Sequence, residues 1–474
     1  MFNSIHEECG VFGIFEPKIA DVSHTTYLAL YALQHRGEEA CGITVCDDGI
    51  FRQHKGLGLV SDVFTKESLD NLGYANMAIG HVRYSTTGIN NINNIQPLTV
   101  RHLKGNLALA HNGNLTNAKE LRNKFEMNGA IFHATSDTED IAYSIVASRL
   151  QTRSIEEAIE MSMYELKGAY SCCLMSPSKL IAFRDPNGFR PLCLGITKTK
   201  GYVIASESCA LDAIGAKFIR NILPGEILVI SEEGLKSIKT HCTDKHTLCV
   251  FEFIYFARPD SIIENSSVHQ ARINAGKILA KESGVDADVV IGVPDSGLDA
   301  ALGYSMESKI PYGIGFIKNK YVGRSFIQPT QKERESAVKI KLNVIKETIK
   351  DKRVILIDDS IVRGTTSARI IKLLKDAGAK EVHMRISSPA FKFPCYFGTD
   401  IDSKENLIAC KYDTVEEIAK VIGADSLAYL SIDGAHHLAQ NSKCQFCDAC
   451  FSGKYPVETP KDEEKNIFEQ KINR

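Results

Sequence analysis

Residues Val354–Ser367 read VILIDDSIVRGTTS, an unbroken apolar run followed by two carboxylates and a small hydroxyl-rich loop. The run Val354–Ile357 is typical of a parallel strand that is buried on both faces. Asp358 and Asp359 are then expected at the carboxyl end of this strand, where open α/β sheets bind ligands. An amphipathic helix is predicted to follow from about Ala368 to Asp376. The stretch therefore predicts an α/β domain with a binding loop between a strand and a helix.

The loop offers groups suited to two parts of one ligand. Backbone N–H groups and hydroxyls of Gly364, Thr365, Thr366 and Ser367 can bind a phosphate at the start of a helix. The two preceding carboxylates would repel that phosphate, so we assign them to sugar hydroxyls or to hydrated Mg²⁺. An acidic cap before an ordinary helix is the alternative interpretation. The uncommon GTTS sequence favours the binding loop.

Length and composition bound the class of protein. The 474 residues are enough for two or more domains. Lys plus Arg total 56 and Asp plus Glu total 58, so the charge gives no reason to expect a nucleic-acid partner. No apolar run reaches the ~18 residues that cross a membrane, and Met1–Glu8 lacks the features of a secretory signal. We therefore expect a cytoplasmic protein, whose fourteen cysteines are buried residues, metal ligands or nucleophiles rather than disulfides.

Cys9 heads a short predicted strand, CGVFGIF. A cysteine in such a place is usually a small buried hydrophobic residue. The alternative is that Met1–Glu8 is removed, which would give Cys9 a free α-amine. Such an amine titrates near a pKa of about 8 and can take the thiol proton, so Cys9 would be a nucleophile with its own general base.

Two charged residues of the first half need partners. Arg83 falls inside a predicted strand, and a substrate carboxylate would satisfy its guanidinium through two hydrogen bonds. Ser136 and Glu139 match a capping box before an apolar helical run. Asp137 between them would then be available to bind a cationic group.

An apolar strand predicted at Leu107–Ala110 ends in HNGN, residues 111–114. Asn-Gly is most often a hairpin turn. The alternative is that the amide of Asn112 and the backbone N–H of Gly113 form an oxyanion hole. Short strands separated by turns occupy residues 168–237, after the predicted helices, which indicates a layered α+β domain.

The first half resembles the N-terminal-nucleophile glutamine amidotransferases, a family that releases ammonia from glutamine. Spaced motifs in that family's order carry the resemblance: CGVFGIF from Cys9, LQHRGEEACGI from Leu33, GHVRYSTTG from Gly80, HNGNL from His111 and TSDTE from Thr135. The resemblance implies a four-layer αββα fold and a propeptide that ends at Glu8. It also implies that Cys9 is the nucleophile, Arg83 holds the glutamine α-carboxylate, Asp137 holds its α-ammonium, and Asn112 with Gly113 stabilises the oxyanion.

A second buried strand, predicted at Val289–Val293, ends in PDSG, residues 294–297. Ser296 and the backbone around Gly297 are suited to a pyrophosphate. A plain strand-to-helix turn is the alternative interpretation. Pairing with the strand that ends at Asp358 favours a two-sided phosphate site.

The polar, basic segment Lys318–Leu342 lies between these two strands. A solvated loop is the default interpretation of such a charge run. Its position between two phosphate loops favours a lid that brings Lys320 and Arg324 over an anionic substrate and excludes water.

The last cysteines form the pattern C-x2-C-x2-C at Cys444, Cys447 and Cys450, with Cys395 and Cys249 upstream. Three closely spaced thiols favour metal ligation. Spacing alone does not distinguish zinc from an iron–sulfur cluster.

The second half resembles the type I phosphoribosyltransferases, on VILIDDSIVRGTTS and VIGVPDSG. Taken from end to end, the chain resembles the amidophosphoribosyltransferase family, which makes 5-phosphoribosylamine from glutamine and 5-phosphoribosyl 1-diphosphate at the committed step of purine synthesis. The propeptide and late cysteines are similar to those of its iron–sulfur branch. That branch implies a [4Fe-4S] cluster on Cys249, Cys395, Cys447 and Cys450, with Cys444 left over.

The same resemblance implies the other ligands. The diphosphate substrate is expected on Asp295, Ser296, Gly297, Asp358, Asp359, Gly364, Thr365, Thr366 and Ser367. Mg²⁺ is expected on Ser296, Asp358 and Asp359. Purine nucleotides are expected as feedback inhibitors, and the assembly as a homotetramer.

The expected organisation is a propeptide at residues 1–8, a glutaminase domain at 9–245, a phosphoribosyltransferase domain at 246–455 and a charged tail at 456–474. A sugar-phosphate amidotransferase would share the first half but lacks the DDSIVRGTT loop. A phosphoribosyl-diphosphate-sensing regulator that binds DNA is a rival of another class. The balanced charge and the complete glutaminase half count against it.

Overall fold

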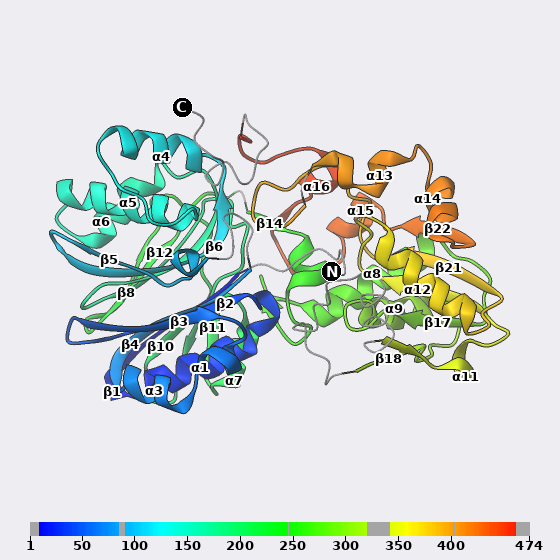
Figure 1. The fold of residues 1–474 in the computed structure, drawn as a ribbon, viewed down its shortest axis with the longest axis horizontal. Helices are drawn as coiled ribbons and strands as arrows, with labels where there is room; N and C mark the ends of the chain where they lie inside the picture. Colours follow the sequence, from blue (N-terminus) through cyan, green and yellow to red (C-terminus); the bar gives the residue numbers. More distant parts are fainter. Residues whose placement is uncertain (1–8, 85–90, 245, 320–341, 402, 461–474) are drawn as a thin grey trace.

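The computed structural model describes residues 9–84, 91–244, 246–319, 342–401 and 403–460. The chain forms two halves that lie side by side (Figure 1). The predicted propeptide, the lid residues Lys320 and Arg324, and tail residues 461–474 lie outside the described residues.

Two antiparallel sheets form the centre of the first half. The seven-stranded sheet has the order β11-β9-β10-β1-β4-β2-β3, with β1 Gly10–Ala20, β2 Ala40–Asp47, β3 Ile50–Leu57, β4 Ala75–Arg83, β9 Cys193–Ile196, β10 Tyr202–Ala205 and β11 Lys217–Asn221. The six-stranded sheet has the order β13-β12-β8-β7-β6-β5, with β5 Leu98–His102, β6 Gly105–Leu115, β7 Gly168–Met175, β8 Leu180–Arg184, β12 Ile227–Ser231 and β13 Gly234–Ile238.

Side-chain alternation along β1 explains why this half has four layers. Val11 and Phe15 pack between the two sheets, whereas Phe12 and Ile14 face the outer helices. Helices cover the outer face of the first sheet at α1 Val22–Ala32, α2 Val60–Val63, α3 Lys66–Leu72 and α7 Ser208–Ala213, and that of the second at α4 Ala118–Met127, α5 Asp137–Gln151 and α6 Ile155–Met163. The predicted αββα fold is therefore confirmed.

A parallel sheet with the order β17-β20-β21-β22 organises the second half. Its strands are β17 Val289–Gly292, β20 Arg353–Asp358, β21 Glu381–Ile386 and β22 Ser426–Tyr429. On β20, Ile355 and Ile357 pack toward α8 (Val268–Glu282) and α9 (Leu298–Ser308). Val354 and Leu356 pack toward α12 (Thr365–Asp376) and α14 (Val415–Ile422). The apolar run is thus buried on both faces, as predicted for an α/β phosphoribosyltransferase fold.

A two-stranded parallel pair, β14 Thr247–Cys249 with β23 Gln445–Cys447, joins residues far apart in the second half. A π-helical turn, η3 Glu252–Phe256, follows β14. The remaining short elements are η1 Gln34–Arg36, η2 Ile92–Asn94, β15 Ile262–Ile263, β16 Ser266–Ser267, β18 Phe316–Lys318, β19 Leu342–Val344, α11 Lys346–Ile349, η4 Lys404–Asn406, α13 Ile408–Lys411, α15 Ile432–His436 and α16 Ala449–Ser452.

The helix after the binding loop starts earlier than predicted. α12 begins at Thr365 rather than near Ala368 because Gly364 precedes it in the left-handed region, at φ +80°. A Cβ on Gly364 would also lie 2.4 Å from Cδ1 of Ile408. The positive φ therefore favours glycine here, and a Cβ would also require the end of the Ile408 side chain to move.

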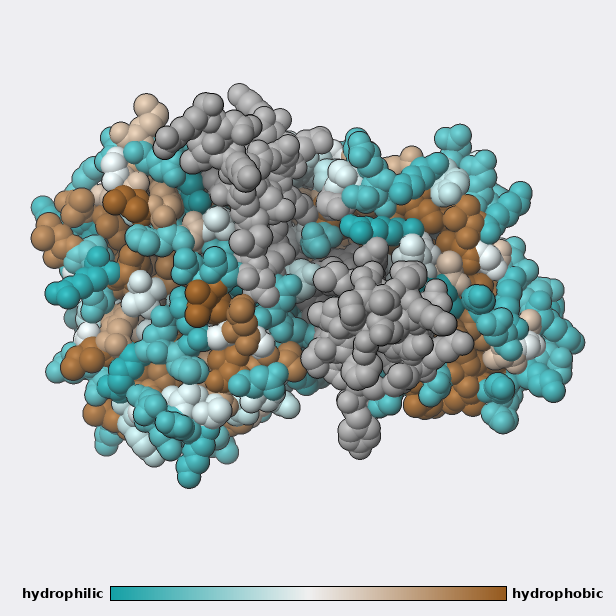
Figure 2. Space-filling model, in the orientation of Figure 1, coloured by the Kyte–Doolittle hydropathy of each residue, from teal (hydrophilic) through white to brown (hydrophobic). Residues whose placement is uncertain are grey.

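Among the described residues, no helix has the length and apolar character needed to cross a bilayer. On the face in Figure 2, hydrophobic side chains are scattered among hydrophilic ones over both halves. Isolated exposed hydrophobic side chains of this kind are ordinary on protein surfaces.

Candidate active sites

Cys9 lies directly before the central strand β1, at the edge of the seven-stranded sheet that is formed by strand ends. Because Gly10 pairs with Val82 on β4, Cys9 comes next to the end of β4, where Arg83 lies. The Cys9 thiol donates to the carbonyl of Tyr84 at 3.5 Å, and Nε of Arg36 donates to the Cys9 carbonyl at 3.1 Å. Cys9 and Arg83 are both buried. The structure thus gathers the predicted nucleophile and the predicted carboxylate-binding residue.

The other sheet meets this edge through β6. Nε2 of His81, on β4, lies 3.1 Å from the carbonyl of His111, on β6, so it donates to that oxygen. Burial lowers the pKa of His81 to about 3, which keeps the ring neutral. His81 precedes Arg83 by two residues and Asn112 follows His111. The strand contact therefore brings Asn112 toward Cys9.

Asn112 and Gly113 do not form a hairpin turn. They continue β6, because Asn112 pairs with Ser171 and Gly113 with Tyr170 on β7. Nδ2 of Asn112 is buried and has no hydrogen-bond partner among the described residues. Buried amides are normally satisfied, so this donor is suited to an oxygen of a bound ligand. Gly113 has φ +141°, and a Cβ there would lie 2.1 Å from the carbonyl oxygen of Ala169.

Asp137 begins α5 and is tied to β6. Its Oδ2 accepts the backbone N–H of Leu115 at 2.8 Å, and its Oδ1 lies 3.6 Å from Nδ1 of His111. Burial alone would raise the pKa of Asp137, but His111 and the Leu115 N–H hold it below its usual value. The carboxylate is therefore charged and suited to an ammonium group.

The predicted capping box beside Asp137 is wrong. Ser136 accepts from the N–H of Thr138, two residues on, rather than from that of Glu139. The Glu139 carboxylate accepts from His133 and Ala134 instead. Helix α5 therefore has an N-terminal cap, but without the reciprocal bond of a box.

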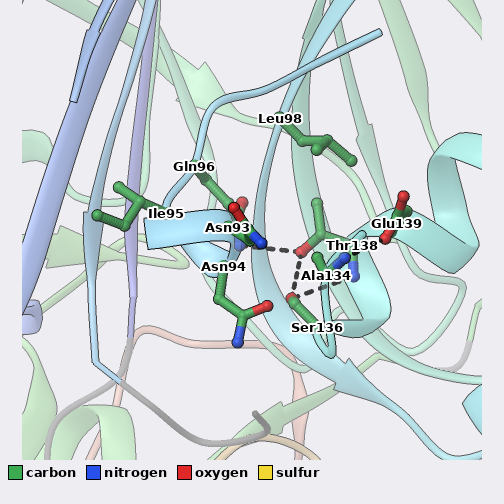
Figure 3. Close-up of a pocket in the computed structure, with 9 residues that line it drawn as sticks. All are labelled: Asn93, Asn94, Ile95, Gln96, Leu98, Ala134, Ser136, Thr138 and Glu139. Carbon is green, nitrogen blue, oxygen red and sulfur yellow. Dashed lines mark hydrogen bonds between the residues drawn. The ribbon is translucent and has the colours of Figure 1, made fainter. Parts of the chain in front are cut away.

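Gln96 was missed by sequence reasoning and connects two of these elements (Figure 3). Its Oε1 accepts the N–H of His111 at 2.6 Å, and its Nε2 donates to Oγ1 of Thr138 at 2.9 Å. The buried amide thus fixes β6 beside Asn112 to the first turn of α5 beside Asp137. A single glutamine in a polar stretch carries no signal of such a role.

The second site lies at the carboxyl edge of the parallel sheet. Asp358 is the last residue of β20, and the Ser296 hydroxyl donates to the Asp359 carboxylate. The loops after β17 and β20 therefore meet, as predicted. Burial raises the pKa of both carboxyls, and the charge of Asp359 raises that of Asp358 further. Two adjacent buried carboxylates and a hydroxyl form an oxygen donor set that fits Mg²⁺.

The first turn of α12 lies beside this pair in the chain. Within the part of the chain that the structure describes, no side chain caps α12, and its first turn, from Thr365, holds no acidic residue. Backbone N–H groups of Thr366 and Ser367 have no partner within the helix by its geometry, which suits a phosphate. Asp295, in contrast, is exposed and forms an ion pair with Lys318.

Four cysteines of the second half are grouped together. Cys249 and Cys447 lie opposite each other on β14 and β23. Burial, followed by the neighbouring thiols of Cys395, Cys249 and Cys447, raises the pKa of Cys450 well above its usual value. Burial raises the pKa of Cys447 to about 12. The thiols of Cys447 and Cys450 therefore stay protonated unless a metal compensates for their burial.

Cys444 belongs to a different environment from this group. Its Sγ lies 2.6 Å from Oγ of Ser442. Within the described residues, no three His, Cys, Asp or Glu side chains are spaced to hold a single metal ion. In an iron–sulfur cluster each thiol binds a different iron, so the thiols stand further apart than the ligands of one zinc. All fourteen cysteines lie in the described residues and none is in a disulfide.

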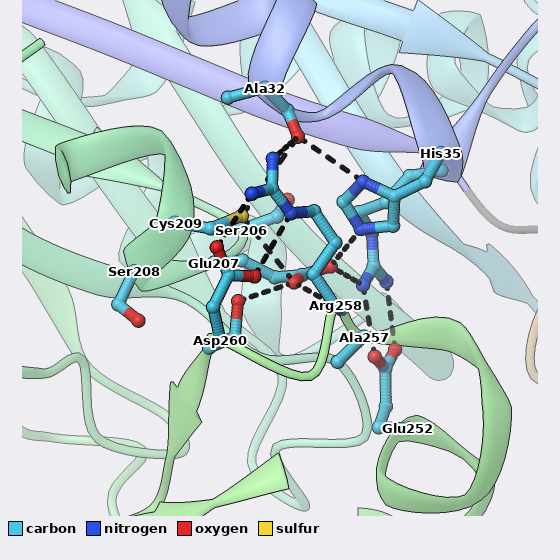
Figure 4. Close-up of polar contacts among 12 residues, drawn as sticks. Ala32, His35, Ser206, Glu207, Ser208, Cys209, Glu252, Ala257, Arg258 and Asp260 are labelled. Carbon is cyan, nitrogen blue, oxygen red and sulfur yellow. Dashed lines mark hydrogen bonds and ion pairs between the residues drawn. The ribbon is translucent and has the colours of Figure 1, made fainter. Parts of the chain in front are cut away.

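A buried ionic network links the two halves (Figure 4). Arg36, after α1, donates to Glu207 at 2.6 Å and to Glu252 of η3 at 2.8 Å. Although burial raises the pKa of Glu207, His35 and Arg36 lower it below its usual value. Because Arg36 also contacts the Cys9 carbonyl, this network reaches the first site. Its members are too far apart in sequence to have been grouped by a motif.

Two family profiles match the chain. One, described as a glutamine amidotransferase domain, matches residues 81–213. The other, described as a phosphoribosyl transferase domain, matches residues 264–387. The amidophosphoribosyltransferase of Archaeoglobus fulgidus is 48% identical over 96% of this chain and 99% of its own length. That of Bacillus subtilis is 47% identical over 97% of this chain and 96% of its own.

Solved structures extend the likeness to three dimensions. The B. subtilis glutamine phosphoribosylpyrophosphate amidotransferase, complexed with ADP and GMP, matches with a TM-score of 0.89 and 47% identity over 96% of this chain and 99% of that chain. A structure described as the allosteric regulatory enzyme of purine biosynthesis matches with a TM-score of 0.91 and 46% identity over 98% of this chain and 99% of that chain. With nearly the whole length covered at this level of identity, the chain belongs to the amidophosphoribosyltransferase family.

Proposed function

We propose that this amidophosphoribosyltransferase releases ammonia from glutamine at Cys9 and transfers it to 5-phosphoribosyl 1-diphosphate at Asp358 and Asp359. The products are glutamate, pyrophosphate and 5-phosphoribosylamine, which begins purine synthesis. The observation that carries the proposal is the presence of both constellations on one chain, joined by the buried Arg36–Glu252 junction. Ammonia must stay unprotonated to react, and the full burial of the Arg36 and Glu252 side chains at this junction supports a route that excludes water.

Equal yields of glutamate and pyrophosphate are the expected result when the purified protein receives glutamine, 5-phosphoribosyl 1-diphosphate and Mg²⁺. Ammonium chloride should replace glutamine in pyrophosphate release. Glutamate formation without pyrophosphate under these conditions would point instead to a glutaminase that serves another acceptor.

In the glutaminase step, the Cys9 thiolate attacks the side-chain carbonyl of glutamine. Arg83 is suited to the α-carboxylate and Asp137 to the α-ammonium, which orients the carboxamide. The tetrahedral oxygen would accept from the Asn112 amide and from the Gly113 backbone. Collapse of this intermediate releases ammonia and leaves a thioester, and water then releases glutamate.

From the unsatisfied amide of Asn112 we predict how its removal changes kcat and KM of this step. In Asn112→Ala, kcat for glutamine hydrolysis should fall by about 10²–10³-fold, because one oxyanion donor is lost. The KM for glutamine should change little, since the donor acts on charge that develops after binding. Asn106→Ala, at the other end of β6, is the control. A rise in KM with kcat unchanged would place Asn112 in ground-state binding instead.

Cys9 acts in this way if removal of Met1–Glu8 exposes its α-amine as the general base. The placement of Cys9 at a strand end and its polar surroundings support this proposal. The expected mature chain begins at Cys9, and intact-mass measurement decides the point.

In the transfer step, Asp358 and Asp359 are suited to the ribose hydroxyls, and the first turn of α12 to the 5-phosphate. Ser296 and Gly297 are suited to the pyrophosphate. Mg²⁺ held by Ser296, Asp358 and Asp359 would neutralise the charge that develops on the leaving pyrophosphate. A lid formed by Lys320 and Arg324 remains a proposal that rests on the sequence.

We further propose that Cys249, Cys395, Cys447 and Cys450 hold a [4Fe-4S] cluster. Their grouping supports it. Such a cluster would cross-link β14, β23 and the segment around Cys395.

The proposed cluster predicts the metal content of the protein. The purified protein should be brown and contain about four irons per chain. Cys450→Ser should lose iron and colour, whereas Cys444→Ser should keep both, because Cys444 pairs with Ser442 instead. Stoichiometric zinc, or equal loss of iron in both variants, would contradict the assignment.

The regulation and the assembly are proposals, and one relative supports the first of them. The B. subtilis structure contains ADP and GMP, which supports purine nucleotides as feedback inhibitors of this chain. A homotetramer is the assembly that we propose, and sedimentation measurements with and without nucleotide would test it.

A further inference from the structure

A loop of the second half contacts β6, the strand of the first half that carries Asn112 and Gly113. We call residues 395–401 the cysteine loop. Nδ2 of Asn114 donates to the Tyr396 carbonyl at 3.1 Å, across 282 positions of sequence. The contact lies one residue beyond Gly113 on β6.

The first half holds the cysteine loop firmly. Arg190 is fully buried, and its Nε and Nη2 donate to the Phe397 carbonyl at 3.2 and 2.7 Å. The rings of Phe189 and Phe397 stack, with centroids 4.3 Å apart and planes inclined by 14°. The position of the loop is thus fixed by charge-assisted hydrogen bonds and by packing.

Gly398 brings the loop closest to the predicted oxyanion hole. It has φ +115°, and a Cβ there would lie 3.2 Å from Nη2 of Arg190 and 3.4 Å from the carbonyl carbon of Gly113. A side chain would therefore strain the backbone, crowd the Arg190 guanidinium that holds the loop, and lie in van der Waals contact with Gly113.

Strand β6 has a neighbouring strand on one side at this point. Among the described residues, β5 pairs with β6 between Gly105 and Leu109, and beyond Leu109 the pairing within the sheet is with β7. On the β7 side, the carbonyl of Ala169 leaves no room for a Cβ at Gly113. The cysteine loop contacts the same residue from a different part of the chain.

We propose that the cysteine loop is a positioning element for the oxyanion hole, so that the glutaminase site is complete only when the second half is folded against it. This inference rests on the proposed function, because it assumes that Asn112 and Gly113 stabilise the oxyanion. Cys395 is the first residue of the loop. Any group held by Cys395 therefore fixes one end of the oxyanion support.

Gly398→Ala tests the inference, with Gly423→Ala as the matched control. Gly423 also has a positive φ, +79°, but a Cβ there meets nothing within 4 Å. In Gly398→Ala, kcat for glutamine hydrolysis should fall by about 10–100-fold, the effect expected of a small misplacement, with KM little changed. Ammonium-dependent activity should persist in both variants.

An aldehyde analogue of glutamine distinguishes a misplaced oxyanion hole from general disruption of the glutamine site. It forms a tetrahedral adduct with the thiol, so its inhibition constant should rise in Gly398→Ala in parallel with the loss of kcat. Inhibition by glutamate, which forms no such adduct, should stay unchanged. An equal weakening of both inhibitors, or none, would overturn the inference.

The wild-type protein separates this inference from the proposed function. If the wild type neither hydrolyses glutamine nor binds the aldehyde, the proposed function fails. If the wild type hydrolyses glutamine and binds the aldehyde, and Gly398→Ala does so equally well, only the inference fails. If Gly398→Ala does not fold, Asn114→Ala can replace it, because this variant removes the donor to Tyr396 without adding atoms. The inhibition constants of the aldehyde and of glutamate then test the inference in the same way.

Discussion

Cys9→Ala should abolish glutamine-dependent pyrophosphate release while leaving the reaction with ammonium salts near the wild-type rate. Loss of a covalent nucleophile costs at least about 10⁴-fold in enzymes that act through one. Ammonium salts supply the ammonia directly, so the second site at Asp358 does not need the thiol. Initial rates of pyrophosphate release with each nitrogen source measure the two activities in one preparation.

Cys410→Ala is the control for removal of a thiol, because Cys410 is exposed and lies in the second half. It should match the wild type with both nitrogen sources. If processing needs the Cys9 thiol, the intact mass of Cys9→Ala should still include Met1–Glu8. Loss of both activities in Cys9→Ala would instead show that the two sites do not act separately.

The double substitution Asp358→Asn and Asp359→Asn should abolish phosphoribosyl transfer, whether glutamine or ammonium supplies the nitrogen. Each carboxylate is suited to charge-assisted hydrogen bonds, worth about 1.5–3 kcal/mol each, so a loss of at least about 100-fold is expected. Asparagine preserves the shape of each side chain but not its charge. Binding of the aldehyde analogue at Cys9 should persist, because it reports the first site alone.

Asp376→Asn is the matched control for this change. Asp376 is the last residue of α12, the helix that follows the binding loop, and its side chain is exposed. It should retain full activity with glutamine and with ammonium. If the double substitution affected only the glutamine-dependent reaction, the carboxylates would belong to coupling between the sites rather than to the acceptor site.

Some features of the candidate sites were predictable because their signals are local. The apolar run of β20 places Asp358 at its end through strand geometry alone, and the structure has this arrangement. The order of a glutaminase half and a phosphoribosyltransferase half followed from motifs of a few residues each. The residue roles at both sites stay predictions.

The sequence by itself determined the two fold classes and the end of β20 at Asp358, because periodicity and turn chemistry act over a few neighbouring residues. Only the tertiary structure decided that Asn112 stays within β6, since strand pairing with β7 overrides the turn preference of Asn-Gly. It also decided the roles of Gln96 and Arg36 and the contact between Asn114 and Tyr396. Those contacts join residues from 15 to 282 positions apart, and packing of whole layers, which no local pattern encodes, brings them together.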